Sequence, residues 1–515
     1  MRSAACETWL VLGVLFCAAG VAADEPRGEA LTTQPATGVA TTQPTSQPSP
    51  PAAPTPGPKS GPKFLALRYD EDFSYLDGPA GSYTPDLFDP VKNIHLGDDW
   101  RLSLGGEVRL RFESETNRNF GAFDPTNDNF MIQHYLLHAD LKYRKLARVF
   151  VQGVDARVAD RDLPLPAGMV NQFDLNQAFA DFSLLGDGGP LWLRAGQFEM
   201  VYGKERLVGP SHWTNVSRRY DGLRLMVRTP TLDLDAWWSK PIVFVASPYG
   251  SPLRPHVWDN LDHKFDHPRS EQQFFGAYAT YKGVRNTVID LYGLGLTDDG
   301  LLVNANRRLG DLTLYTVGTR IAGTLADFDH DSEFAYQWGR FAGDDVRAWM
   351  FDADAGYTLR GLPWTPRVGA GLEVATGDRR AGDGRVQTFN QLFHTGHAWL
   401  GYIDLVGLQN VIAFDTSLTV KPLKNVTARA AYYHFWLASD TDALYGANGQ
   451  PIRRDLSGAS GDDVGDEFDV TVQWQVDAHS SLLVGASHFW PDRFVERSGP
   501  SRDADLFYLQ WQFKF

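Results

Sequence analysis

Cysteine is nearly absent from this chain, and its two cysteines, Cys6 and Cys17, both lie close to the N-terminus. The same region has the parts of a secretory signal, with Arg2 in a short n-region and an apolar run over residues 9–19. That run is shorter than the roughly 20 residues of a membrane-spanning helix. We therefore predict a cleaved signal peptide over residues 1–23 and an exported chain without thiols, as suits an oxidising compartment.

Other features are missing as well. The mean hydropathy is −0.30, which excludes a helical membrane protein. The 48 basic residues are outnumbered by 63 acidic ones, so no nucleic-acid partner is expected. Signatures of hydrolases, zinc proteases and phosphate loops are lacking, and Ser487 and His488 are adjacent in a predicted strand, where they face opposite ways. We therefore do not expect an enzyme.

Two segments precede the regular part of the chain. Residues 24–63 are rich in Pro, Thr, Gln and Ala and have almost no large apolar side chain, so we predict a disordered periplasmic linker. A cell-wall contact or a glycosylated stalk is the alternative for it. Residues 64–99 are aromatic and acidic without a clean period, and we expect an ordered periplasmic segment that leads into the barrel described next.

From Trp100 the sequence alternates between apolar and polar residues, as in WRLSLGGEVRLRFE. Many such segments are roughly 11 to 14 residues long, whereas soluble strands average roughly 5 to 6 and tilted membrane strands need roughly 9 to 11. We therefore predict an all-β fold over residues 100–515, a transmembrane antiparallel β-barrel with short periplasmic turns and long extracellular loops.

About eighteen strands are predicted, an even number as bacterial barrels have. They are expected to begin near Trp100, Phe130, Ala147, Asp174, Pro190, Val216, Thr231, Gln272, Asn286, Leu312, Phe334, Val346, Pro366, Gln409, Asn425, Asp466, Ser480 and Ala504. The alternation of short turns and long loops fails once, because the turn at residues 326–332 is long and the loop at residues 342–345 is short.

The last predicted strand, DLFYLQWQFKF, alternates to its end at Phe515. A terminal Phe on such a strand resembles the C-terminal assembly signal of bacterial outer-membrane proteins. Together with the signal peptide it predicts a protein embedded in the lipid of the bacterial outer membrane.

A closed barrel pairs every backbone group in lipid, so the polar stripe of each strand must line the inside. The predicted lumen residues are Arg109, Arg111, Arg194, Arg224, Arg320, Arg367 and Arg429, with Glu107, Asp352 and Glu373 among them. Guanidinium groups bind carboxylates through a planar pair of donors, which favours an anionic solute. The alternative is that these charges neutralise one another and fill the lumen structurally.

Acidic clusters occur in two predicted loops, Asp440 with Asp442, and Asp462 and Asp463 with Asp466. Carboxylate oxygens of this kind can hold Ca²⁺. Solvated loop charge explains them equally simply and is the interpretation that we favour. No other cofactor is expected.

Several segments carry a family resemblance. The most specific are QTFNQLFHTGHAWLGYIDLVGLQN at residues 387–410 and AYYHFWLASDTDALYGANGQPIRRD at residues 431–455. A third group is DLNQAFADF at residues 174–182, followed by LRAGQFEMVYGKERLV and RRYDGLRL. With them the chain resembles the alginate export family of outer-membrane porins from residue 100 to residue 515. The resemblance implies a monomeric barrel that lets an anionic polysaccharide diffuse through an arginine-lined constriction gated by loops. Periplasmic export proteins are left open as partners, because the sequence does not identify them.

The loop at residues 387–410 is our candidate for that constriction, because it is rich in Gly, His and aromatic residues. Its candidate residues are Phe389, Asn390, His394, His397 and Asp404. Two other functions are kept open. One is a general or small-organic-acid uptake porin. The other is a non-conducting adhesion or structural barrel with a plugged lumen, in which large loops such as residues 246–269 would carry the function.

Overall fold

The computed structural model describes residues 61–79, 81–163, 168–242 and 266–515. The predicted signal peptide and nearly all of the predicted linker lie outside these residues, as does most of the loop at residues 246–269. Within the described part of the chain, no helix has the length and hydrophobicity of a membrane span.

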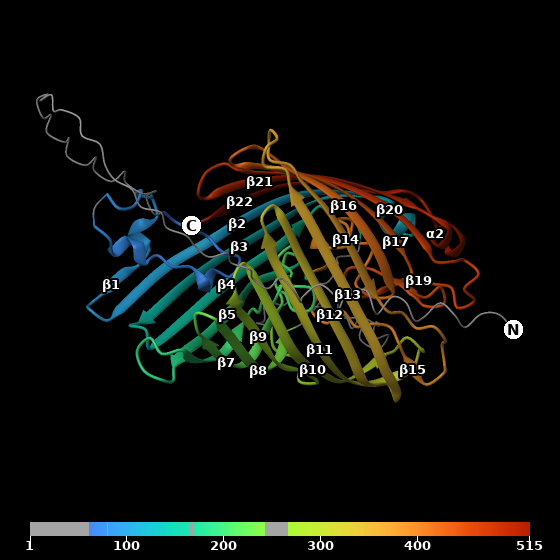
Figure 1. Ribbon diagram of the computed structural model, residues 1–515, viewed down its shortest axis with the longest axis horizontal. Helices are drawn as coiled ribbons and strands as arrows, with labels where there is room; N and C mark the ends of the chain where they lie inside the picture. Colours follow the sequence, from blue (N-terminus) through green and yellow to red (C-terminus); the bar gives the residue numbers. More distant parts are fainter. Residues whose placement is uncertain (1–60, 80, 164–167, 243–265) are drawn as a thin grey trace, which may run out of the picture. The chain divides into compact units, whose positions relative to one another are not determined.

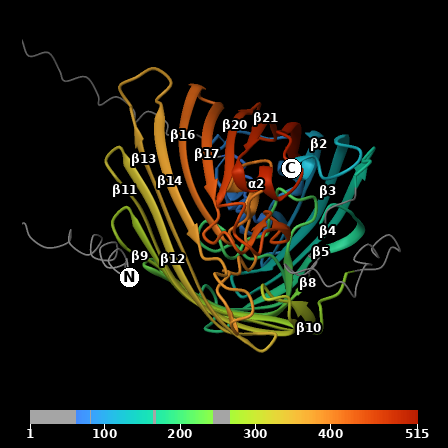
Figure 2. The ribbon, with the colours of Figure 1, turned by 90° about the vertical axis from the view of Figure 1, so that its right-hand side faces the viewer.

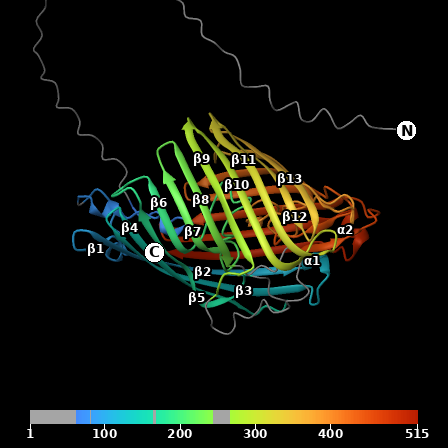
Figure 3. The same cartoon turned by 90° about the horizontal axis from the view of Figure 1, so that it is seen from below.

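One sheet contains 20 strands, of which 18 form a closed ring and two, β1 (Ile94–Leu96) and β15 (Arg385–Val386), are short additions to it. The 18 strands of the ring are β2 (Trp100–Thr116), β3 (Asn127–Tyr143), β4 (Ala147–Ala159), β5 (Asn171–Ser183), β6 (Leu191–Phe198), β7 (Arg219–Arg228), β8 (Leu232–Ile242), β9 (Gln272–Val284), β10 (Thr287–Val303), β11 (Leu309–Leu325), β12 (Phe328–Phe341), β13 (Asp344–Thr358), β14 (Arg367–Ala375), β16 (Val411–Leu423), β17 (Val426–Trp436), β20 (Asp463–Gln475), β21 (Ser480–Pro491) and β22 (Ala504–Lys514). Neighbours along the chain pair antiparallel, and β22 pairs with β2 to close the ring. Figure 3 shows consecutive strands from β6 to β13 side by side.

The remaining elements are short. They are a hairpin of β18 (Ala443–Tyr445) and β19 (Pro451–Arg454), the helices α1 (Arg118–Gly121) and α2 (Arg493–Ser498), and the 3-10 turns η1 (Arg68–Asp70), η2 (Ser74–Asp77), η3 (Asp89–Val91) and η5 (Gly396–Ala398). β1 lies at the end of the barrel that holds the C-terminus, whereas β19 and α2 lie at the other end (Figure 1).

The predicted barrel of eighteen strands is confirmed, and most predicted strand starts fall within three residues of the observed ones. One part was wrong. The turn expected to be long at residues 326–332 contains only Ala326 and Asp327, because β12 already begins at Phe328. Its polar start looked like loop sequence, but Asp331 faces the interior and pairs with Arg320 of β11, with Arg320 Nη2 2.5 Å from Asp331 Oδ2.

Along each strand, side chains alternate between the outer and the inner face of the barrel, as the sequence pattern predicts. On β12, Phe334, Tyr336 and Trp338 are each about 40% exposed, whereas Ala335 and Gln337 between them are fully buried. The same holds at the closing strand, where Phe507, Leu509 and Trp511 are exposed. The outer surface is therefore apolar and aromatic, as lipid contact requires.

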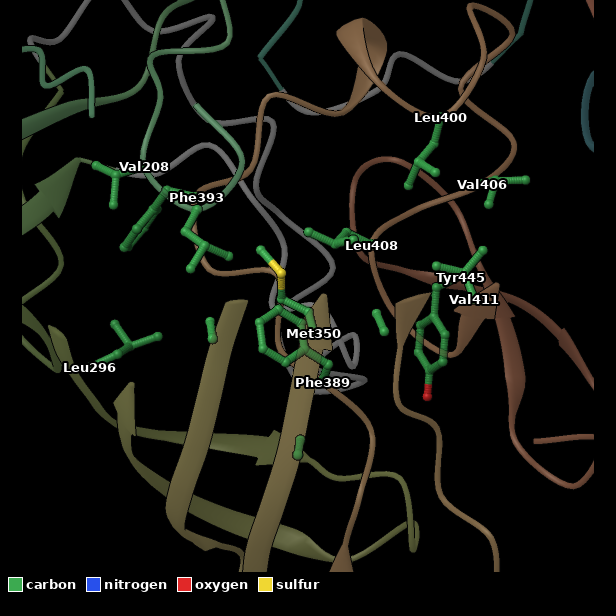
Figure 4. Packing of buried hydrophobic residues seen from close by; sticks show 14 of the residues in the cluster. Val208, Leu296, Met350, Phe389, Phe393, Leu400, Val406, Leu408, Val411 and Tyr445 are labelled. Carbon is green, nitrogen blue, oxygen red and sulfur yellow. The ribbon is translucent and has the colours of Figure 1, made fainter. Parts of the chain in front are cut away.

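The hydrophobic core lies inside the ring rather than between layers. Figure 2 shows chain segments within the ring of strands. Phe389, Phe393 and Leu408 from one interior loop pack with Val208 from another and with Met350 of β13 (Figure 4). Two interior loops are thus anchored to the barrel wall by apolar contacts.

We expect the lipid-facing position Val317, which is 49% exposed in the middle of β11, to tolerate Val317→Leu but not Val317→Lys. A charge there should destabilise the barrel by about 2–4 kcal/mol, the cost of a cation facing the bilayer midplane. Urea unfolding in lipid vesicles measures the difference. Equal stability of the two variants would contradict the assigned outer face.

Candidate functional site

Two long loops meet inside the barrel, residues 199–218 between β6 and β7 and residues 387–410 between β14 and β16. We call the pair the crossbar, because β6 and β14 stand eight strands apart in the ring of 18. Backbone hydrogen bonds join them as in a sheet, with Phe393 N–H donating to the Leu207 carbonyl over 3.0 Å and Gly209 N–H donating to the Phe393 carbonyl over 3.0 Å. The interior is therefore spanned from one wall to the nearly opposite one.

Side chains reinforce the junction of the two loops. Arg218 Nη1 donates to the carbonyls of Phe393 and His394, over 2.8 and 2.5 Å. His394 is fully buried, and burial lowers its pKa to about 3, so the ring is neutral. Its Nδ1–H can therefore donate to the Arg206 carbonyl, 2.7 Å away.

The second loop is also fixed to the wall. Gln337 of β12 donates its amide to the Asn390 carbonyl and accepts from the Asn390 N–H, both over 2.8 Å. Ile403 N–H donates to Glu467 of β20 over 2.9 Å. Of the residues predicted for the constriction, Phe389, Asn390 and His394 are thus buried parts of the loop framework.

The other two predicted constriction residues are His397 and Asp404, with His397 Nδ1 3.3 Å from Asp404 Oδ1. The His397 ring belongs to a stack of side chains. His397 lies parallel to Trp213 at a centroid distance of 3.6 Å, and Tyr402 lies beyond it at 4.8 Å. The guanidinium carbon of Arg111 is 3.7 Å from the centre of the Trp213 ring. Since stacked rings and a cation over a ring attract one another, this stack holds the crossbar against β2.

The structure places the predicted lumen arginines on the interior face, but most of them are in ion pairs. The pairs are Arg111 with Glu113, Arg194 with Asp181, Arg224 with Asp235, Arg320 with Asp290 and Asp331, and Arg367 with Asp329. Arg109 donates instead to the carbonyls of His212 and Thr214. The arginines do not form a ring of free cations.

Arg429 differs from the others. It is half-buried, and its nearest polar partners are the hydroxyls of Tyr433, 3.3 Å away, and Tyr402, 3.5 Å away. Among the residues that the structure describes, no carboxylate oxygen lies within 4.0 Å of it. The carboxylates of Asp415 and Asp469 act on Arg429 only from beyond that distance. Its hydrogen-bonding groups therefore remain open to an anion.

The predicted lumen carboxylates Asp352 and Glu373 meet at Arg206 of the crossbar. Arg206 Nη2 is 2.6 Å from Asp352 and 2.5 Å from Asp354, and Arg206 Nε is 3.5 Å from Glu373. Burial alone would lower the pKa of Arg206, but these carboxylates outweigh it and raise the pKa. Sequence reasoning missed Arg206, since the alternation of strand faces says nothing about a loop residue.

The third predicted carboxylate, Glu107, lies near the end of the barrel that carries the C-terminus. Its Oε2 is 3.9 Å from Lys514 and 4.0 Å from Arg68, which comes from the segment predicted at residues 64–99. Arg68 donates to the carbonyls of Gly106 and Phe515, both over 2.9 Å, at the seam where β22 meets β2. Tyr69 beside it donates to the Glu199 carbonyl of the crossbar over 3.0 Å. This segment therefore enters the interior from the end that holds the C-terminus and contacts the crossbar.

Three carboxylates of the acidic clusters considered for Ca²⁺ contact basic side chains. Arg454 donates to Asp442, and His434 lies 3.3 Å from Asp463 and 2.5 Å from Asp466. In the described ranges, no three His, Cys, Asp or Glu side chains converge as a metal site would require. The solvated-charge interpretation is wrong for Asp442, which is buried and accepts hydrogen bonds from Thr388 and Arg454.

Comparison with known proteins gives a family and a fold. A family model described as alginate export matches residues 100–508. Among curated proteins, none matches this chain. Solved structures from Pseudomonas aeruginosa are similar in fold: OpdL, at 11% identity and a TM-score of 0.54, and the outer membrane protein OprD, at 12% identity and a TM-score of 0.53. Each similarity covers 80% of this chain, with 98% of OpdL and 93% of OprD.

We predict that raising the pH loosens the crossbar. His212 Nε2 lies 2.9 Å from Glu199; burial alone would lower the His212 pKa, but this contact raises it. The stabilisation is full below the ordinary histidine pKa of about 6.5 and is lost as the pH rises through the higher folded value. Single-channel conductance should increase over that range in the native protein and stay flat in His212→Gln. A pH response that persists unchanged in the variant would contradict this role.

We also expect Arg206→Met to open the crossbar. It leaves three carboxylates without their buried cation, and removing one partner of a buried ion pair costs about 3–5 kcal/mol. Lys204→Met in the same loop is the matched control, because the Lys204 side chain is 38% exposed. Larger conductance and faster proteolysis of the loop are expected for Arg206→Met alone. Identical behaviour of the two variants would show that Arg206 does not hold the loop.

Proposed function

Because this chain belongs to the alginate export family, we propose that it is a passive outer-membrane channel for an anionic saccharide or polysaccharide. Its fold is that of outer-membrane proteins such as OprD, and its location in the bacterial outer membrane follows from the fold and the family.

The observation that carries the proposal is Arg429. Arg429 is half-buried on the interior face of β17, next to Tyr402 of the crossbar. Its hydrogen-bond partners are the hydroxyls of Tyr402 and Tyr433 rather than a carboxylate. A carboxylate of a passing uronate unit would supply the missing charge and two good acceptors. The paired arginines then serve as lumen walls, and Arg429 is the position at which an anion gains most.

We propose no chemical step for this protein. Ser487 is buried on the inner face of β21, whereas His488 points away from it and binds Asp505 over 2.6 Å. The adjacent pair therefore cannot act as nucleophile and base. Passage by diffusion needs neither.

A second candidate, uptake of small organic acids, is favoured by the crossbar itself. The two loops span the interior, and the segment carrying Arg68 and Tyr69 reaches them from the end with the C-terminus. A single small acid would pass the remaining space more readily than a polymer. A plugged, non-conducting barrel is the limiting case, and conductance separates it from both channels.

Planar bilayer recordings test the proposal. We expect the native protein to prefer anions and to be blocked by oligouronates, and Arg429→Gln to lose most of both effects. Arg429→Lys keeps the positive charge but loses the pair of coplanar N–H donors of the guanidinium. It should therefore keep the anion preference and bind oligouronates more weakly.

The outcomes are distinct. Anion preference that survives in Arg429→Gln would remove Arg429 from the pathway. Block by small monocarboxylates but not by oligouronates would favour the uptake candidate. A lack of conductance would leave only the structural barrel.

A further inference from the structure

A chamber of about 380 Å³ lies within the barrel, between the crossbar, the segment that carries Arg68, and the wall formed by β2 to β5, β21 and β22. Its volume falls in the range of roughly 300–1,000 Å³ that small-molecule sites occupy. We propose that this chamber is a binding subsite for one neutral sugar unit, recognised through its hydroxyl groups rather than through a charge. The inference rests on the proposed function, because it places the subsite on the path of the saccharide.

Side-chain amides are unusually frequent in the lining. Gln152 of β4, Gln177 of β5, and Gln510 and Gln512 of β22 all border the chamber. An amide offers both donors and an acceptor, as a sugar hydroxyl does, so a set of four can bind several hydroxyls at once. Such a lining is better suited to hydroxyl groups than to carboxylates.

Gln152 gives the second, independent sign of a ligand. It is only 1% exposed, and its Oε1 accepts hydrogen bonds from Asn176 over 2.8 Å and from Gln177 over 3.0 Å. Its Nε2 has no hydrogen-bond partner in the described structure. A buried donor is costly when it is left unpaired, and a sugar oxygen is an acceptor that would satisfy it.

The arginine, lysine and glutamate charges that border the chamber are equal in number. Three cationic side chains, Arg68, Arg109 and Lys514, face three carboxylates, Glu107, Glu199 and Glu205. Glu107 accepts from Gln512 over 2.7 Å, Glu199 contacts His212 at 2.9 Å, and Glu205 accepts from the Thr395 hydroxyl over 2.8 Å. Arg68 is held by Glu71, and Arg109 by loop carbonyls. Because these three cations and three carboxylates are equal in number, they give the lining no net charge that would attract an anion.

The crossbar side of the chamber is rigid and partly apolar. Trp213 and His397 border it, and their stacking on each other and on Arg111 fixes both rings, so that ring edges rather than open faces line the space. Leu136 of β3 adds an apolar side chain. Ring edges and a leucine suit the C–H groups of a sugar, while the amides on the wall suit its hydroxyls.

The test uses the full chain in planar bilayers, with glucose and maltotriose as neutral probes and glucuronate as the anionic probe. We expect both neutral sugars to interrupt the current, and Gln152→Met to weaken this block at least tenfold. Gln473→Met is the matched control: Gln473 is an exposed glutamine near the end of β20 that does not border the chamber. Its sugar block should equal that of the native protein.

A second variant, Gln510→Met, guards against a folding defect in Gln152→Met, and heat-modifiable mobility on gels verifies that each barrel is closed. Equal block in the native protein and both chamber variants would overturn the subsite while leaving anion conductance, and thus the proposed function, intact. Glucuronate block that is tenfold stronger than glucose block and equally lost in Gln152→Met would overturn recognition without charge.

If the barrel does not conduct, the proposed function fails, but the subsite is still tested. Tryptophan fluorescence of the detergent-solubilised protein then reports glucose binding next to Trp213. Saturable quenching that Gln152→Met abolishes supports the chamber, and its absence in the native protein overturns it.

Discussion

The whole structure depends on one constraint, that a strand in lipid must have every backbone N–H and C=O paired. The ring of 18 strands satisfies it only because β22 returns to β2, with Glu107 opposite Lys514 and Thr116 opposite Asp505 at the ends of the register. Arg68 adds a side-chain donor to the last carbonyls of that seam, those of Gly106 and Phe515. Closure in turn sorts the strand side chains into an outer, apolar set and an inner set that holds both the charges and the apolar core.

The inward-facing charges impose a second constraint, because each of them must be paired. Charges that face the interior and are covered by its loops lose much of their hydration, so each needs a partner of opposite charge or good hydrogen bonds. The crossbar meets that demand, because Arg206 enters from a loop to face Asp352, Asp354 and Glu373 on the strands. The interior is thus organised by ion pairs between loop and wall as much as by apolar packing. A group such as Arg429, which lacks such a partner, stands out for that reason.

The similarity to the Pseudomonas aeruginosa barrels is one of fold, at 11 to 12% identity. Such low identity is understandable, since alternation requires only the polar or apolar character of a strand residue and not its type. We propose that selectivity depends on the few residues that face the remaining interior space. In this chain these are Arg429, whose hydrogen-bond partners are tyrosine hydroxyls, and the amides around Gln152, which would act on different parts of the same saccharide.

The sequence by itself determined the strands, their number and the face of each residue, because strand side chains alternate with a period of two and this signal is local. It was misled only where inward charges such as Asp331 resembled a loop. The tertiary structure alone decided which charges meet, that the loop with Arg206 and Trp213 crosses the lumen, and that four glutamines from β4, β5 and β22 share one chamber. Those contacts join residues hundreds of positions apart, and they exist only after the ring closes and brings its first and last strands together.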